Sequence, residues 1–145
     1  MVITFRGAIY FLRKIIMAQS KKKILVVEDD SMISSMYKTK FMADGFDVFI
    51  ADNGVIGLEL AKKEKPDIIM LDVILPQLDG FSVLDQIKKD EATKNIPVIM
   101  LTNLGTEEDK QKGEAMGALD YLVKASLTPG QVSEKIKQAL NIKKE

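Results

Sequence analysis

A run of three acidic residues directly follows a short apolar segment near the start of this sequence. Glu28, Asp29 and Asp30 form the run, and a further acid, Asp72, follows another apolar segment. Acids that follow a buried strand are unfavourable unless a cation neutralises them. Carboxylate oxygens are ligands that Mg²⁺ prefers. The pattern therefore predicts an Mg²⁺ site made by Glu28, Asp29 and Asp72, whereas we interpret Asp30 as a cap of the following helix.

Asp72 and two other polar residues could carry phosphoryl chemistry at that site. The Asp72 carboxylate can attack phosphorus and form an aspartyl phosphate. Thr102 could donate a hydrogen bond to a phosphoryl oxygen, and Lys124 would supply positive charge. The plainer interpretations are a strand-end hydroxyl for Thr102 and a salt bridge from Lys124 to Asp72 or Asp29. Chemistry is favoured because these residue types end successive apolar segments.

The chain lacks the two residue types that supply most nucleophiles and bases at neutral pH. Its 145 residues include no Cys and no His. Thiol nucleophiles, disulfides, Cys/His zinc sites and Ser-His-Asp triads are therefore excluded. The 21 basic and 21 acidic residues give a formal net charge of zero. This balance provides no general electrostatic reason to bind nucleic acid.

The elements that must position these residues are short apolar runs that alternate with segments of helical period. The runs are rich in β-branched residues and mostly unalternated, which is typical of strands buried on both faces of a parallel sheet. This alternation of strands and helices predicts one α/β domain, a doubly wound sheet of five strands with five helices. Right-handed crossovers bring the functional groups to the carboxyl ends of the strands. The predicted strands are 24–27, 48–51, 68–71, 98–101 and 119–123, and the predicted helices are one capped by Ser31 and ended by Gly45, then 54–64, 81–90, 106–116 and 129–140.

The charges are divided unevenly along the chain. Residues 1–23 hold six of the 21 basic residues and no acid, so 15 basic and 21 acidic residues remain in 24–145. The apolar run in this N-terminal leader, residues 1–23, is too short to span a membrane, because Arg13 and Lys14 interrupt it. It also matches a secretory signal poorly.

We interpret residues 1–16 as dispensable or as an over-extended start, because Met17 would serve as an independent start. The alternative is a weak amphipathic membrane anchor. The predicted organisation is an N-terminal extension of residues 1–20, not native or disordered, a domain of residues 21–142 and a tail of residues 143–145. We expect no attached output domain.

The sequence resembles the response regulator receiver domains of two-component signalling, of the stand-alone chemotaxis type. The resemblance covers about residues 21–142 and rests on four segments in a specific order and spacing. They read KILVVEDD (23–30), PDIIMLD (66–72, continuing through Pro76 to Asp79 and Gly80), PVIMLTN (97–103) and GALDYLVK (117–124). The resemblance implies a flavodoxin-like sheet with strand order 2-1-3-4-5 and a cytoplasmic phosphorylation switch.

The resemblance also implies a role for each acid. Asp72 would accept a phosphoryl group from the phosphohistidine of a sensor histidine kinase or a histidine phosphotransfer protein. Mg²⁺ would be held by Glu28, Asp29 and Asp72 with the main-chain carbonyl of Ile74. Beyond accepting and slowly losing this group by self-catalysis, the protein is not expected to be an enzyme.

Three further residues would make the switch. Thr102 and Lys124 would sense and bind the phosphoryl group. Tyr121 matches the family's switch aromatic, which turns inward and changes the surface that binds a target protein. Its plainer interpretation is a half-buried aromatic on an edge strand. The target is not identified by the sequence, and neither direct nucleic-acid binding nor a transmembrane segment is expected.

The sequence departs from the family pattern after Lys124 and after Thr102. Ala125 stands where the family usually has a proline joined by a cis peptide, and a cis bond before a non-proline residue costs about 2.5–4 kcal/mol. Lys124 therefore either precedes a strained cis bond or is presented on a trans path. Asn103 is larger than the usual small residue, and it could contact the phosphoryl group or narrow access to it.

Two apolar positions are expected to tune the lifetime of the phosphorylated state. Ile74 and Leu104 lie two residues beyond Asp72 and Thr102, where the family controls self-dephosphorylation, with Asn103 beside them. Bulky apolar side chains there should obstruct or fail to orient the attacking water. We therefore expect slow self-dephosphorylation.

Three other functions compete with this interpretation. A receiver-like binding module that no longer accepts phosphate is possible because of Ala125. An Mg²⁺-dependent phosphohydrolase of the haloacid dehalogenase type is less favoured, because Asp72 is followed by Val-Ile-Leu and not by a second Asp. A nucleotide-binding protein is disfavoured because no Gly-rich loop follows the first strand.

Overall fold

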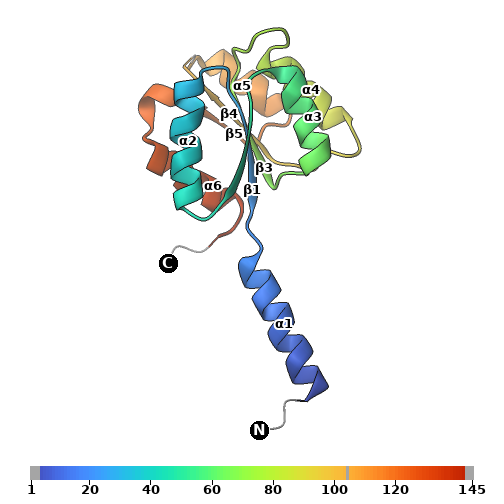
Figure 1. The fold of residues 1–145 in the computed structure, drawn as a ribbon. Coiled ribbons are helices and arrows are strands. Elements are labelled where there is room, and N and C mark those ends of the chain that lie inside the picture. Colours follow the sequence, from blue (N-terminus) through green and yellow to red (C-terminus); the bar gives the residue numbers. More distant parts are fainter. Residues whose placement is uncertain (1–3, 104, 143–145) are drawn as a thin grey trace.

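One parallel sheet organises the part of the chain that the computed structural model describes, residues 4–103 and 105–142. Its strands lie in the order β2-β1-β3-β4-β5, which confirms the expected topology. On one face lie α2 and α6, and on the other lie α3, α4 and α5 (Figure 1). The strands are β1 (Lys23–Val27), β2 (Asp47–Ala51), β3 (Ile68–Leu71), β4 (Val98–Thr102) and β5 (Asp120–Val123), and the helices of the domain are α2 (Ser31–Ala43), α3 (Gly54–Glu64), α4 (Gly80–Lys89), α5 (Glu107–Ala115) and α6 (Pro129–Ala139).

The central strands are apolar throughout because successive side chains enter two different cores. In β1, Leu25 and Val27 pack under α3 and α4, whereas Ile24 and Val26 pack under α2 and α6. All four are at most 1% exposed. Each fully buried aliphatic side chain contributes roughly 1.5–3 kcal/mol relative to an exposed one. The unalternated runs therefore correctly predicted strands covered on both faces.

Most element boundaries agree with the sequence to within one or two residues. Of the two caps suggested for the first domain helix, Asp30 is confirmed and Ser31 is wrong. Asp30 is the N-cap of α2, and its carboxylate accepts the amides of Met32 at 2.9 Å and Ile33 at 3.1 Å. Ser31 is already the first helical residue. The helix ends at Ala43, and Gly45 follows with φ of 95°, a conformation that favours glycine.

A further helix, α1 (Phe5–Gln19), precedes the domain. Disorder was one expectation for residues 1–20, but the structure describes a helix there that extends away from the sheet (Figure 1). Among the described residues, no helix combines the length and apolar character needed to cross a membrane.

Candidate metal and phosphoryl site at the carboxyl edge of the sheet

Parallel pairing of β1 and β3 brings two acids of the site, Glu28 and Asp72, together. Leu71 of β3 pairs with Val27 of β1, so the residues that follow these strands leave the sheet side by side. The ladder continues one step further, since the amide of Asp72 donates to the carbonyl of Val27 at 3.0 Å. Glu28 and Asp72 therefore begin their loops from rigid, neighbouring backbone.

The three predicted ligands do form one acidic cluster. Carboxylate oxygens of Glu28, Asp29 and Asp72 all lie within 4.8 Å of one another. Glu28 and Asp72 are 5% and 7% exposed, while Asp29 opens to solvent. A set of hard oxygen donors with one open side fits Mg²⁺, which binds through a few carboxylates and keeps several waters. The residues present therefore fit the predicted cation.

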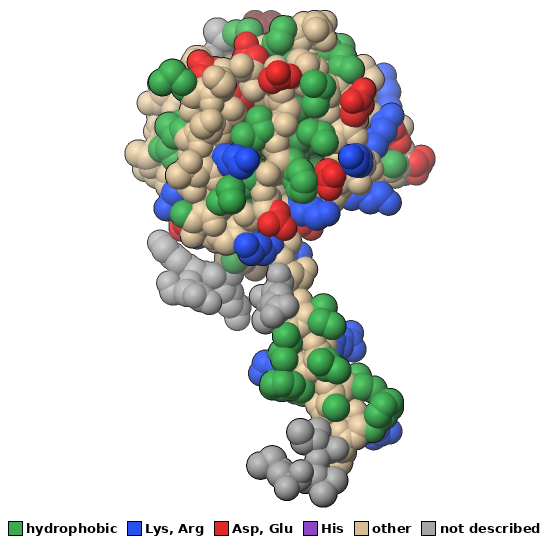
Figure 2. Space-filling view, viewed as in Figure 1, with side chains coloured by type: hydrophobic (Ala, Val, Ile, Leu, Met, Phe, Trp, Pro, Cys, Tyr) green, Lys and Arg blue, Asp and Glu red, His purple; other side chains and the backbone are tan. Residues whose placement is uncertain are grey.

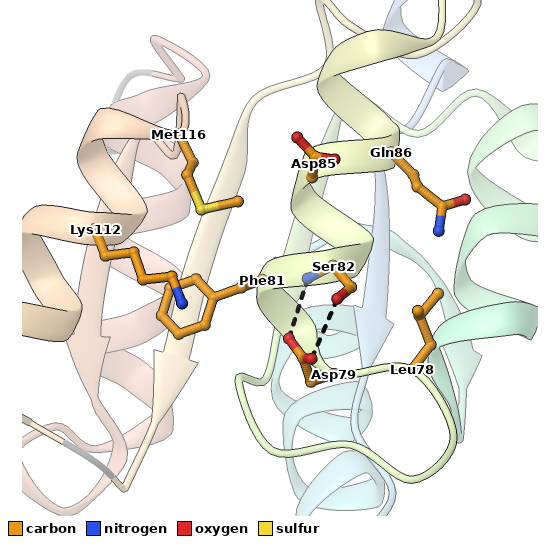
Figure 3. A pocket seen from close by; sticks show the side chains of 8 residues that line it. All are labelled: Leu78, Asp79, Phe81, Ser82, Asp85, Gln86, Lys112 and Met116. Carbon is orange, nitrogen blue, oxygen red and sulfur yellow. Dashed lines mark hydrogen bonds between the residues drawn. The ribbon is translucent and has the colours of Figure 1, made fainter.

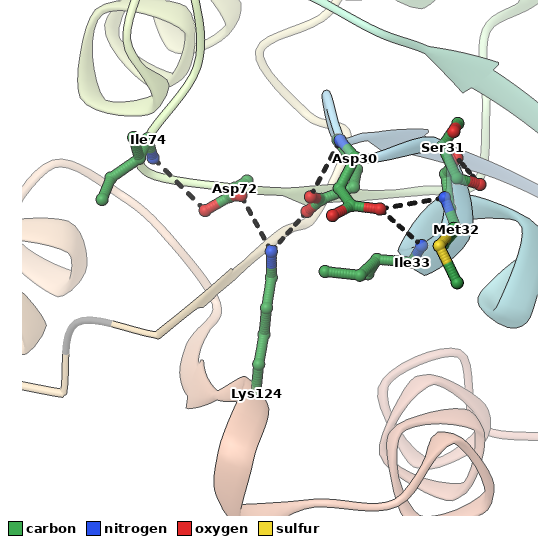
Figure 4. A network of polar contacts seen from close by, with 9 residues as sticks. Asp30, Ser31, Met32, Ile33, Asp72, Ile74 and Lys124 are labelled. Atoms are coloured by element: carbon green, nitrogen blue, oxygen red, sulfur yellow. Dashed lines mark hydrogen bonds and ion pairs between the residues drawn. The ribbon is translucent and has the colours of Figure 1, made fainter.

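Lys124 reaches this cluster from the end of β5, an edge strand of the sheet. It lies just beyond β5, in a 3₁₀ turn η1 (Lys124–Ser126), and its Nζ donates to Asp72 Oδ2 at 2.8 Å and also to Glu28 Oε2 (Figure 4). The sequence prediction of a partner was right for Asp72, but the second partner is Glu28 and not Asp29. The described residues contain no cis peptide bond, so Lys124 reaches the acids on a trans path despite Ala125.

The charges of the cluster perturb one another. Burial raises the pKa of Glu28 to about 7, with a further increase from neighbouring Asp72 and a partial offset by Lys124. Burial alone would lower the pKa of Lys124, but its contacts with Asp72 and Glu28 outweigh this and raise it. When all three carboxylates are ionised, they and the ammonium group of Lys124 sum to −2, the charge that a divalent cation would neutralise.

The loop after β3 folds over the Asp72 carboxylate. The amide of Ile74 donates to Asp72 Oδ1 at 3.2 Å, opposite Lys124 (Figure 4). The Ile74 side chain is 57% exposed beside this contact, and Asn103 is also exposed. Leu104, the other predicted tuning residue, lies outside the described residues.

Thr102 and Tyr121 lie on the two strands nearest Lys124. Thr102 ends β4, is 0% exposed, and pairs with the residue just before Lys124. Tyr121 is buried at 6% exposure rather than half-buried, and burial raises its pKa. Its ring faces α5, where a Cβ on Gly113 would lie 3.3 Å from the ring.

Sequence reasoning assigned no role to Gly80, the first residue of α4. A Cβ there would lie 2.1 Å from the carbonyl oxygen of Asp72 and 2.7 Å from the Cα of Val73. The amide of Gly80 donates to the carbonyl of Val73 at 2.8 Å. Glycine therefore lets α4 begin against the backbone that carries Asp72. The available signal was the Asp79-Gly80 pair ahead of a helical pattern.

A hollow between α4 and α5 was also missed (Figure 3). It measures about 430 Å³. Lys112 lies 4.2 Å from the ring centre of Phe81, a cation–π contact that joins the two helices. Asp79 caps α4 at its edge, accepting the Ser82 amide at 3.0 Å. The lining residues are Leu78, Asp79, Phe81, Ser82, Asp85, Gln86, Lys112 and Met116.

Comparison with known proteins identifies a family that matches most of this chain. The family model for the response regulator receiver domain matches residues 24–137. The Vibrio cholerae chemotaxis protein CheY4 superposes with a TM-score of 0.77 at 30% identity, covering 82% of this chain and 98% of that protein. A response regulator from Chloroflexus aurantiacus superposes with a TM-score of 0.78, also at 30% identity, covering 84% of this chain and 99% of that one.

Curated relatives include proteins of two lengths. The DNA-binding regulator RpaA of Synechocystis is 45% identical over 102 residues, which are 70% of this chain and 42% of that protein. Protein PilH of Pseudomonas aeruginosa is 42% identical over 104 residues, which are 70% of this chain and 84% of that protein. The matched region thus spans less than half of RpaA and most of PilH.

Proposed function

This chain belongs to the response regulator receiver domain family, and we propose that Asp72 is its phosphoryl acceptor. The observation that carries the proposal is a nearly buried carboxylate at a strand end, 2.8 Å from the ammonium group of Lys124 and within an acidic cluster. An isolated structural salt bridge would not require two further acids at the same place. Receiver domains act with histidine kinases or histidine phosphotransfer proteins, and we propose a phosphohistidine of such a partner as the donor.

In the proposed step, a carboxylate oxygen of Asp72 bonds to phosphorus as the phosphorus–nitrogen bond of the phosphohistidine breaks. The leaving imidazole keeps the electron pair and takes up a proton. Glu28, Asp29, Asp72 and the Ile74 carbonyl would hold Mg²⁺, which when bound supplies positive charge for the phosphoryl oxygens. Lys124 offsets negative charge at the acceptor, and the Ile74 amide orients its carboxylate.

The switch would pass from Thr102 to Tyr121. Both side chains are buried and both strands end beside Lys124, so a contact between Thr102 and the new phosphoryl group would alter packing around Tyr121. We propose that this changes the outer surface of β5 and its flanking helices, where a target protein binds. RpaA is named as a DNA-binding regulator; for this chain, we propose a protein target.

A receiver-like module that no longer accepts phosphate is the second candidate. Its support is Ala125, but the trans path still delivers Lys124 to Asp72. A phosphohydrolase would need a second acid to protonate the leaving group. Both alternatives make predictions that labelling can distinguish.

The test is labelling of the full chain by a small acyl phosphate. We expect one phosphoryl group per molecule by intact mass, only with Mg²⁺, and background labelling in Asp72→Asn. Asp79→Asn is the matched control, because Asp79 is exposed and asparagine can still cap α4. Unchanged labelling of Asp72→Asn would refute the assignment, absence of labelling would favour the binding module, and repeated turnover would favour the hydrolase.

The labelled protein also tests the proposed lifetime. Once donor and excess Mg²⁺ are removed, we expect slow loss of the label, because the apolar Ile74 side chain beside Asp72 does not orient a water. Ile74→Asn should accelerate the loss by roughly 10-fold or more, within the range that positioning of a reactant supplies. Ile74→Val is the control and should change the rate little. An equal rate in Ile74→Asn would remove Ile74 from the tuning positions.

A further inference from the structure

Helix α1 carries a continuous apolar face that touches no core of the domain. Its apolar side chains recur at helical spacing, and at 100° per residue they fall within an arc of roughly 160°. Those that are most accessible are 49–81% exposed. Figure 2 shows hydrophobic side chains over much of the visible face of α1, beyond the rounded surface of the domain. The arc consists of Phe5, Ala8, Ile9, Phe11, Leu12, Ile15 and Ile16.

The charged residues on the remaining surface of α1 are all basic, and Tyr10, 69% exposed, lies among them. Arg6, Arg13 and Lys14 lie outside the apolar arc and are exposed, and the helix contains no acidic residue. Lys22, just before the sheet, and Lys23, the first residue of β1, each already lie within 4.0 Å of an acid of the domain. The positive charge that is not paired with an acid of the domain therefore lies on α1, beside its apolar face, and on exposed Lys21 just after it.

A helix of this length is marginal in water without a partner. Isolated helices below about 12–15 residues are rarely stable, and α1 has 15 residues, several of them β-branched or aromatic. Burial of the apolar arc would supply the missing stabilisation. The partner must accept an apolar helix face flanked by cations.

We infer that α1 lies in the plane of an anionic phospholipid surface. An amphipathic helix with lysine and arginine at its polar edge and bulky apolar residues on the other face has the composition of interfacial helices. The helix is too short to span the bilayer. A membrane anchor was the less favoured interpretation of residues 1–16 from the sequence, and the helical arrangement of the apolar and basic residues now favours it.

Charge complementarity distinguishes lipid from a second copy of the chain. Phe5, Ile9, Leu12 and Ile16 fit a coiled-coil seam, but this covers only two heptads, fewer than the three or four of a sustained coiled coil. Two such helices would also bring six cations together without an acid. An anionic bilayer instead attracts the cations and repels the acidic domain, whose residues 24–145 hold 15 basic and 21 acidic groups. The domain would therefore face away from the surface.

The experiment is co-sedimentation of the full chain with phosphatidylcholine vesicles containing roughly one-third phosphatidylglycerol. We expect binding that weakens with salt and is much weaker on phosphatidylcholine alone. Replacement of Arg6, Arg13 and Lys14 by Gln should weaken binding by about 100-fold, at about 1 kcal/mol for each charge. Leu12→Asp should weaken it by at least roughly 10-fold.

Met42→Asp is the matched control, since Met42 is 55% exposed on α2 and Leu12 is 57% exposed on α1. It should bind vesicles like the parent chain. Leu12→Ala guards against loss of the helix, because alanine favours helix while removing apolar area, and it should still weaken binding. Equal binding to neutral vesicles, insensitivity to the α1 variants, or α1-dependent dimers without vesicle binding would overturn the proposal. A native intact mass that begins at Met17 would also overturn it.

Discussion

At the scale of single residues, the proposed function and the stability of the fold rest on different carboxylates. Glu28 and Asp72 share the ammonium group of Lys124, and Asp29 lies in the same cluster, an arrangement that leaves net negative charge in a nearly buried place. Asp30 is next to them in sequence, yet it caps α2 and does not join the cluster. Spacing along the chain does not separate these roles; the direction in which each side chain leaves its strand end does.

Asp44 shows a carboxylate used for stability. Ser133, which is 0% exposed on α6, donates from Oγ to Asp44 Oδ2 at 2.5 Å at the end of α2. This bond and then the ammonium groups of Lys40 and Lys137 lower the pKa of Asp44, against a smaller opposing effect of burial. The contact therefore joins two helices through an ionised acid.

We expect Ser133→Ala to reduce the free energy of unfolding at pH 7 by about 1–2 kcal/mol. Because Asp44 has a lower pKa in the folded state, its contribution is complete above the ordinary value of 3.8 and is lost as pH falls through the folded pKa. The difference between variant and parent should thus shrink in acid. Urea denaturation at pH 7 and in acid, below the ordinary pKa of 3.8, measures this difference. Ser35→Ala, at an exposed position of α2, is the control. An equal difference at both would contradict this account.

At the scale of elements, the start of α4 determines how the Asp72 loop is held. Gly80→Ala would force a Cβ against the backbone of Asp72 and Val73. Although alanine favours helix, we expect a loss of about 1–3 kcal/mol in the free energy of unfolding. Labelling at Asp72 should weaken too, since the clash displaces the backbone that carries the acceptor.

Gly130 is the matched position in α6. A Cβ there would meet Lys40 Cε at 3.7 Å and Thr128 Oγ1 at 3.8 Å, which are ordinary contacts. Gly130→Ala should therefore stabilise the protein by about 0.4–1 kcal/mol through the entropy of the unfolded chain. Denaturation of the two variants side by side checks the pair. Similar effects of both would show that helix propensity, and not contact with Asp72, controls the first position.

At the scale of the whole molecule, a net charge of zero conceals two unlike parts. The leader is purely basic and the domain is acidic, and the structure places the basic residues of α1 on a helix that extends away from the domain. The acidic charge at the site attracts a cation, while the basic charge on α1 attracts an anionic surface. The two parts are thus suited to different ligands.

Much of this could be predicted from the sequence alone. Unalternated apolar runs predicted the strands because a strand covered on both faces needs apolar residues at every position. Asp72, Glu28 and Asp29 could be placed together because parallel strands end at the same edge. The order of the strands was implied by resemblance to a family rather than derived from the residues.

Other features required the tertiary structure, because they depend on atoms far apart in the chain. Lys124 contacts Glu28 and not Asp29, because the turn after β5 directs its side chain toward Glu28 and Asp72, and it reaches them on a trans path. The need for glycine at Gly80 arises from backbone packed against it from the end of β3. The sequence by itself determined which groups could carry the chemistry and that strand ends would collect them. Only tertiary packing decided which groups touch, since hydrogen bonds and close contacts depend on differences of a few tenths of an ångström.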